Sequence, residues 1–308
     1  MNWLRTTYAQ YFLSISNIFS TNYIKYYFSC NDMSKIEDID KLKEICRDVR
    51  KDIVTMIYKA GSGHPGGSLS ATELMVALFF NIMHHNPKNP EDKSRDRFIL
   101  SKGHAAPAYY SVLARSGYFD VSELENFRKI NSRLQGHPDK SKFPTLETTA
   151  GGLGQGISIA AGKTLALQLD TNPAKIYCIL GDGELDEGQV WESLATIHKY
   201  NLHNLILIVD HNKIQLDGTN AEIKDLEPLD IKFKAFGYEV LEVDGNDMNE
   251  VINTLNYAKT LSDDKNNVII IANTIKGKGV SFMENTAEWH GKAPNKEQYE
   301  QAMKELEQ

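Results

Sequence analysis

A carboxylate and an amide side chain are spaced in this sequence as ligands of a divalent ion could be. Gly181-Asp182-Gly183 precedes Asn212, with 28 residues between Gly183 and Asn212. Carboxylate and amide oxygens are ligands that suit hard cations such as Mg²⁺, Ca²⁺ or Mn²⁺. The two glycines let the backbone approach a phosphate closely, and the positive end of a following helix would face that phosphate. Gly-Asp-Gly alone is also a common turn, but its spacing to Asn212 favours a site for a cation and a phosphate.

A glycine-rich segment, residues 148–156 (TTAGGLGQG), precedes a run of small residues, ISIAAGKTLALQ. Backbone N–H groups in such a segment can bind an anionic group. The alternative is close helix packing through Gly and Ala. The presence of Gly181-Asp182-Gly183 elsewhere in the chain favours the binding role.

Four of the nine histidines stand in loops that contain glycine: His64, His104, His137 and His290. A single loop histidine is usually a solvated side chain. Four of them indicate a shared polar site, in which imidazole groups bind hydroxyls and phosphate. Their spacing does not resemble that of a zinc site.

Short apolar runs alternate with helical stretches and predict the framework that positions these residues. We expect strands at 175–182, 205–210, 238–245 and 268–274, with a helix at 187–200. Strands separated by helices of this length form βαβ units and a parallel sheet. Asp182 and Asn212 then emerge at the same carboxyl edge, where open α/β sheets bind ligands. The predicted fold class is α/β, with a parallel sheet flanked by helices.

The first 32 residues differ from the rest and are expected to lie outside this domain. They carry three charges and nine of the 29 aromatic residues. We interpret them as a targeting leader or as a spurious or disordered extension, and residues 33–308 as one α/β domain. Ser34 and Glu37 have the spacing of a capping box before an apolar stripe at 39–60, and Ser70 and Glu73 repeat that spacing.

The composition excludes several classes of protein. The chain has 308 residues, of which 41% are hydrophobic, so intrinsic disorder is not expected. A net charge of −7 argues against a broad nucleic-acid surface, and no apolar run approaches the roughly 20 residues of a membrane span. The three cysteines form no paired pattern, which predicts a reducing compartment, the cytoplasm.

Several motifs, in order, resemble the amino-terminal half of transketolase. They are the thiamine diphosphate motif GDG…N, and also SGHPGGSLSATEL, DRFILSKGHAAPAYYSVLARSGY, GHPD and LGQGISIA. The resemblance runs from about Lys41 to Pro294. It is strongest to the separate N-terminal subunit of split transketolases, because of the AGGLGQG form and the point at which the chain stops.

The resemblance implies roles for individual residues. Asp182, Asn212 and the backbone carbonyl of Ile214 would bind the divalent ion. Gly154, Gly181 and Gly183 would contact the cofactor, thiamine diphosphate. His104 and His290 would contact the diphosphate and the reacting centre, and His64 and His137 the sugar substrate. Glu187 would be a buried glutamate that joins two cofactor sites through a carboxylate network.

The resemblance also implies a partner. In this family, a glutamate from a second α/β domain activates the cofactor, and we see no room for that domain after about Gly277. We therefore expect a pyrimidine-binding C-terminal subunit, an α₂β₂ assembly, and sugar phosphates as substrates, as in the pentose phosphate pathway. The expected reaction is transfer of a two-carbon ketol unit from a ketose phosphate to an aldose phosphate. Alternatives are half of another thiamine diphosphate enzyme (a 2-oxo acid dehydrogenase alpha subunit or a deoxyxylulose-phosphate synthase) and a non-catalytic cofactor-binding module.

Overall fold

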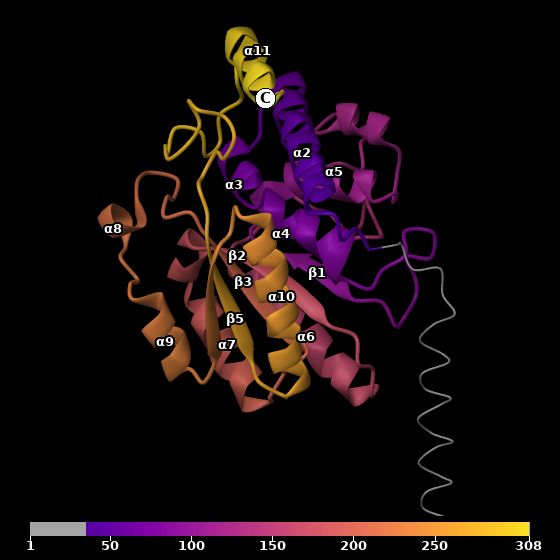
Figure 1. The fold of residues 1–308 in the computed structure, drawn as a ribbon, viewed down its shortest axis with the longest axis vertical. Coiled ribbons are helices and arrows are strands. Elements are labelled where there is room, and N and C mark those ends of the chain that lie inside the picture. The colour runs from indigo at the N-terminus through magenta and orange to yellow at the C-terminus, as the bar shows by residue number, and fades with distance from the viewer. Residues whose placement is uncertain (1–34, 308) are drawn as a thin grey trace, which may run out of the picture. The chain divides into compact units, whose positions relative to one another are not determined.

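Five parallel strands form one sheet in residues 35–307, the part of the chain that the computed structural model describes (Figure 1). Their spatial order is β1-β2-β3-β5-β4. The strands are β1 (Arg97–Leu100), β2 (Ile176–Gly181), β3 (Leu205–His211), β4 (Glu239–Asp244) and β5 (Val268–Asn273). The predicted fold class is confirmed, and four strands lie where the sequence predicted them. β1 was not predicted, because its four residues are too few to show a period.

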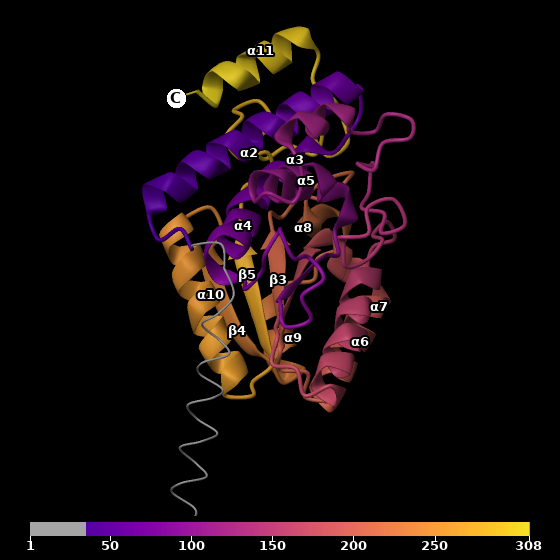
Figure 2. The same ribbon diagram turned by 90° about the vertical axis from the view of Figure 1, so that its right-hand side faces the viewer.

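Helices cover both faces of the sheet (Figure 2). α6 (Gln155–Leu169) and α7 (Gly188–Lys199) lie on one face, and α10 (Met248–Asp263) lies on the other. A third group lies across the carboxyl ends of the strands: α2 (Ile39–Ala60), α3 (Pro65–Ser70) and α5 (Ala106–Arg115), with α11 (Lys296–Glu305) against α2. The other helices are α4 (Thr72–Ala77), α8 (Asn220–Ile223), α9 (Leu229–Ala235), the π-helix η1 (Leu78–Ile82), and the 3₁₀ turns η2 (Gly103–Ala105), η3 (Val121–Asn126) and η4 (Gly183–Asp186).

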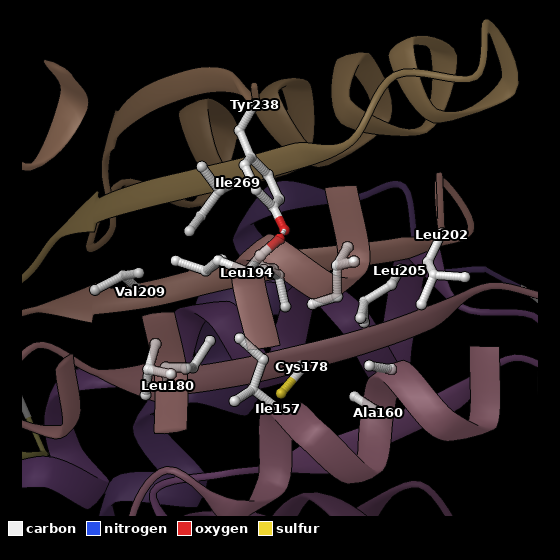
Figure 3. Packing of buried hydrophobic residues seen from close by; sticks show 14 of the residues in the cluster. Ile157, Ala160, Cys178, Leu180, Leu194, Leu202, Leu205, Val209, Tyr238 and Ile269 are labelled. Carbon is white, nitrogen blue, oxygen red and sulfur yellow. Dashed lines mark hydrogen bonds between the residues drawn. The ribbon is translucent and has the colours of Figure 1, made fainter. Parts of the chain in front are cut away.

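The core between the sheet and α6, α7 and α9 consists mainly of aliphatic side chains (Figure 3). Alternate residues of the central strands, among them Cys178, Leu180 and Val209, point into it because successive strand residues face opposite sides. Burial of one such leucine or valine contributes roughly 1.5–3 kcal/mol. Every residue of β2 and β3 is buried, which explains why each strand begins with an unbroken apolar run. Tyr238 closes the cluster and donates its hydroxyl to the Leu194 carbonyl at 3.0 Å.

Two predicted helix starts are wrong. α2 begins at Ile39, and its N-cap is Asp38, whose carboxylate accepts from the N–H groups of Asp40 and Lys41. Glu37 therefore precedes the cap instead of completing a capping box. Ser70 caps no helix either, because it ends α3, and its hydroxyl donates to Asp210 at 2.6 Å.

The predicted leader, residues 1–32, lies outside the described residues, as does Ser34. Among the described helices, none combines the length and the apolar composition needed to cross a bilayer. Cys46 and Cys178 are free and buried.

Candidate active site at the carboxyl edge

A pocket of about 300 Å³ opens at the carboxyl ends of β2 and β3. The register of the sheet explains its place, because Gly181 pairs with Asp210 and the two strands end at one level. Predicted residues from distant parts of the chain line this pocket together: His64, His104, His137, Gly181, Asp182, Gly183, Asn212, Ile214 and His290. Gly154 and Glu187 do not line it.

The three predicted metal ligands meet at the turn that follows β3, where Lys213 N–H bonds to Asp182 and Ile214 N–H bonds to Asn212. Asp182 is buried, and its carboxylate accepts from Lys213 N at 2.5 Å, Asn220 Nδ2 at 3.0 Å and Gly183 N at 2.8 Å. Asn212 Oδ1 accepts from Ile214 N at 3.2 Å. Burial, followed by the neighbouring Asp210 charge, raises the pKa of Asp182. A cation beside this carboxylate would oppose both effects.

Two buried lysines, which the sequence analysis did not single out, also line the pocket. Lys276 Nζ donates to the carbonyls of Ile214 at 2.9 Å and Gln215 at 2.8 Å, and it lies 3.0 Å from His290 Nδ1. Lys102 forms an ion pair with Asp210 and donates to the Gly67 carbonyl at 2.9 Å. Both lysines closely follow a strand end and stand beside a glycine, and this is the signal that could have identified them.

The four predicted histidines form one cluster. His64 is its centre, with ring centroids 5.4 Å from His104, 5.8 Å from His137 and 5.5 Å from His290. His104 and His290 are 5.1 Å apart. His64 Nδ1 is buried and has no hydrogen-bond partner among the described residues. Such a nitrogen is a natural contact for a hydroxyl of a bound ligand.

Burial and positive neighbours keep these imidazoles neutral. Burial, then Arg128, His137 and Lys276, lowers the pKa of His64 to about 4. Burial, then Lys276, His64 and Lys102, lowers the pKa of His290 to about 3. Burial is also the first cause that lowers the pKa of His104 and of His137. Because an ammonium can only donate, His290 Nδ1 accepts from Lys276, which places the imidazole proton on Nε2.

Glu184 is a further buried acid at this edge that the sequence analysis missed. Its carboxylate accepts from Ser101 Oγ, from Gly154 N at 2.7 Å and from Gly181 N at 3.1 Å. These bonds attach the glycine-rich segment to the end of β2. Gly154 has a φ of +76°, so its contribution is to shape this segment at the start of α6.

Glu187 is exposed in the single chain, as the N-cap of α7. The expected burial of this glutamate is therefore not a property of the single chain. Its expected role between two cofactor sites stays a prediction.

The pocket fits a divalent ion and a diphosphate by the chemistry of its donors. Asp182, Asn212 and the Ile214 carbonyl offer the oxygen ligands that a hard cation requires. Lys102 and Lys276 offer ammonium groups to an anion. A side chain at Gly67 would place its Cβ 3.2 Å from His104 Nε2 and 3.3 Å from Lys102 Nζ, so the glycine keeps this wall open.

Comparison with known proteins gives consistent matches. The family described as "Transketolase, thiamine diphosphate binding domain" matches residues 41–307. The 6-deoxy-6-sulfo-D-fructose transketolase subunit SqwG of Clostridium sp. (strain MSTE9) is 42% identical over 259 residues, which cover 84% of this chain and 94% of the relative. One subunit of the apulose-4-phosphate transketolase of Actinobacillus succinogenes is 40% identical over 268 residues, 87% of this chain and 96% of the relative.

Solved structures share the fold. The crystal structure of transketolase from Campylobacter jejuni matches with a TM-score of 0.81 and 34% sequence identity. The match covers 88% of this chain and 43% of that structure.

Proposed function

Because the chain belongs to the transketolase family, as its thiamine diphosphate binding domain, we propose that it acts as the N-terminal subunit of a heteromeric transketolase. The reaction is transfer of a two-carbon ketol unit from a ketose phosphate to an aldose phosphate. The names of the relatives specify apulose-4-phosphate and 6-deoxy-6-sulfo-D-fructose. A sugar with an anionic end group is therefore the substrate class that we propose, and it extends beyond the sugar phosphates that the sequence suggested.

The observation that carries this proposal is the composition of the pocket. Oxygen ligands, two lysines and four imidazoles with lowered pKa values line the same pocket. Oxygen ligands and lysines together suit a metal-bound diphosphate. Neutral imidazoles can donate and accept hydrogen bonds, so they suit a polyhydroxylated substrate.

Each group of residues that lines the pocket has a role in this reaction. Asp182, Asn212 and the Ile214 carbonyl would hold Mg²⁺ or a similar ion, with Lys102 and Lys276 on the diphosphate. When bound, thiamine diphosphate supplies a carbon nucleophile and stabilises the carbanion. His64, with its free Nδ1, and His137 would bind sugar hydroxyls.

His104 and His290 both neighbour His64, and His290 also contacts Lys276, so they can orient the reacting groups. Because burial lowers the pKa of both, they remain uncharged near neutral pH and can exchange protons without first releasing one to solvent.

The partner in this proposal is a pyrimidine-binding subunit, in an α₂β₂ assembly. Both bacterial relatives are named as transketolase subunits, which supports a second chain. Glu187, exposed beside the glycine-rich segment, is available to such an interface. A cytoplasmic location, expected from the cysteine usage, belongs to the same proposal. The four histidines favour a sugar substrate over the 2-oxo acid of a dehydrogenase.

Reconstitution tests this function. The purified chain, with Mg²⁺ and thiamine diphosphate, is assayed for ketol transfer before and after addition of a candidate pyrimidine-binding subunit. We expect no turnover from the chain alone and turnover in the mixture, because the partner supplies the activating glutamate. Turnover by the chain alone would contradict the heteromeric assignment. Cofactor binding without any turnover in the mixture would favour the non-catalytic binding module.

A further inference from the structure

A buried carboxylate lies behind the pocket without lining it. Asp210 is the penultimate residue of β3 and has 0% of its surface exposed. Because Leu207 and Val209 face the core under α6 and α7, Asp210 faces the opposite side of the sheet, toward α3 and the loop after β5. No role follows for it from the motifs in the sequence.

Four donors from four separate segments converge on this carboxylate. Its Oδ2 accepts from Ser70 Oγ at 2.6 Å, from Lys102 Nζ, and from Asn212 Nδ2 at 3.4 Å. Its Oδ1 accepts from Thr274 Oγ1. These donors come from the end of α3 and from the loops that follow β1, β3 and β5. A buried carboxylate requires such compensation, and here the compensating groups include two that line the pocket.

We propose that Asp210 is a positioning residue of the cofactor site, which turns the Asn212 amide so that its oxygen faces the metal and holds the Lys102 ammonium beside the diphosphate. This inference rests on the proposed function, because it concerns the site of the metal and the cofactor.

The Asn212 amide has two chemically different ends. Its Nδ2 donates to Asp210, which leaves Oδ1 for the turn that carries Ile214. A hard cation binds the oxygen and is repelled by the NH₂ group. An ionised carboxylate can accept hydrogen bonds but cannot donate them. Asp210 therefore pairs with the NH₂ group of Asn212, and the amide oxygen is left facing the metal, as metal binding requires.

The Lys102 ammonium is held in a comparable way. It is 1% exposed and donates to Asp210 and to the Gly67 carbonyl, which accounts for two of its three N–H groups. Without the carboxylate, a buried charge would lose its counter-ion and the side chain would move. Asp210 therefore acts on both components of the ligand, the cation through Asn212 and the anion through Lys102.

Coupled substitutions test this role without an activity assay. Titration calorimetry on the full chain measures the affinity for thiamine diphosphate and the Mg²⁺ concentration that half-saturates binding. We expect Asp210→Asn to weaken the affinity at least tenfold and to raise the Mg²⁺ requirement. When Asn212→Ala is already present, adding Asp210→Asn should raise the Mg²⁺ requirement by less than threefold relative to Asn212→Ala alone. A Mg²⁺ requirement that multiplies in the Asp210→Asn/Asn212→Ala variant, or an unchanged affinity in Asp210→Asn, would overturn the proposal.

A matched control variant separates an effect on the cofactor site from a general loss of folding stability. Asp96 is also buried, but it accepts from the backbone of His84 and Lys175 at the opposite edge of the sheet. Asp96→Asn should lower the melting temperature and leave the cofactor affinity unchanged. A loss of affinity like that of Asp210→Asn would mean that any buried carboxylate has this effect.

Asp210→Asn leaves the buried Lys102 ammonium without its counter-ion, and this variant could fail to fold for that reason. A second pair of variants removes the ammonium and covers that case. Lys102→Met and Lys102→Met/Asp210→Asn bury no unpaired ammonium. The double variant should need more Mg²⁺ than Lys102→Met, because its Asn212 amide is no longer oriented; equal requirements would overturn the proposal.

The proposed function is tested by a different measurement, ketol transfer by the assembled protein. Binding without ketol transfer in the assembled protein refutes the proposed function, while the coupling between positions 210 and 212 still decides the positioning role. An assembled wild-type protein that shows no Mg²⁺-dependent binding would refute both.

Discussion

Acid should destabilise the ligand-free chain through the histidine cluster, and His64 allows the size of this effect to be worked out. Burial and neighbouring positive groups lower its pKa from 6.5 to about 4. A group with a lower pKa in the folded state leaves stability intact above its unfolded pKa and reduces it as the pH falls toward the folded pKa. The affected range is therefore pH 6.5 down to about 4. At about pH 5 the shift corresponds to roughly 2 kcal/mol, which we reduce to about 1 kcal/mol because the side chain is partly exposed to solvent.

Thermal unfolding at two pH values tests this reasoning. For a chain of this size, about 1 kcal/mol shifts the melting temperature by roughly 2–4 °C. Between about pH 7.5 and about pH 5, His64→Gln should therefore lose roughly 2–4 °C less than the wild type. His203→Gln, which changes a histidine before β3 and far from the cluster, serves as the control and should follow the wild type. If His64→Gln and the wild type lose the same number of degrees, the imidazole is not held neutral by its surroundings.

Three further predictions concern the pocket and its supporting turns. Asp182→Ala should abolish Mg²⁺-dependent cofactor binding in calorimetry, and Asn212→Ala should weaken it less, because the first variant removes a charged ligand and the second a neutral one; binding that is indifferent to a chelator would contradict both. His137→Ala should reduce turnover of the assembled enzyme by roughly tenfold or more and leave the melting temperature within a few degrees; a large loss of stability with normal turnover would assign it a structural role. Gly154→Ala should destabilise the chain by about 1–2 kcal/mol, since its φ is +76° and the added Cβ would lie 3.0 Å from Cβ of Glu187; an unchanged denaturation midpoint would show that the turn relaxes at no cost.

The sequence predicted the central strands well because their burial leaves an unambiguous signal. β2 and β3 are buried on both faces, and each therefore begins with a continuous apolar run, residues 176–180 and 205–209. Helix starts were less predictable, because several polar residues near each start can serve as a cap. Ser70 has the spacing of a cap, yet its hydroxyl donates to a carboxylate 140 positions away, a contact that no local pattern can contain.

The site was predictable where topology alone brings residues together. Asp182 and Asn212 end neighbouring strands, so their proximity follows from the βαβ connection. Lys102 and Lys276 carry only a weak signal, a position beside a glycine just after a strand end, and Glu184 carries none, since each acts through contacts between distant loops. The exposure of Glu187 depends on whether a partner covers it, and a single sequence does not contain that information.

The order of the strands has a consequence for how the pocket comes into being. Pairing of β1 with β2 closes a loop that comprises residues 101–175, whereas β3 follows β2 after only residues 182–204. Longer loops cost more entropy to close, and non-local contacts form later in folding. We therefore expect the sheet to grow outward from β2 and β3, with β1 docking late. Lys102 and His104 follow β1 directly, so cofactor affinity would be acquired in the final stage of folding, and an excess of cofactor would accelerate no earlier step.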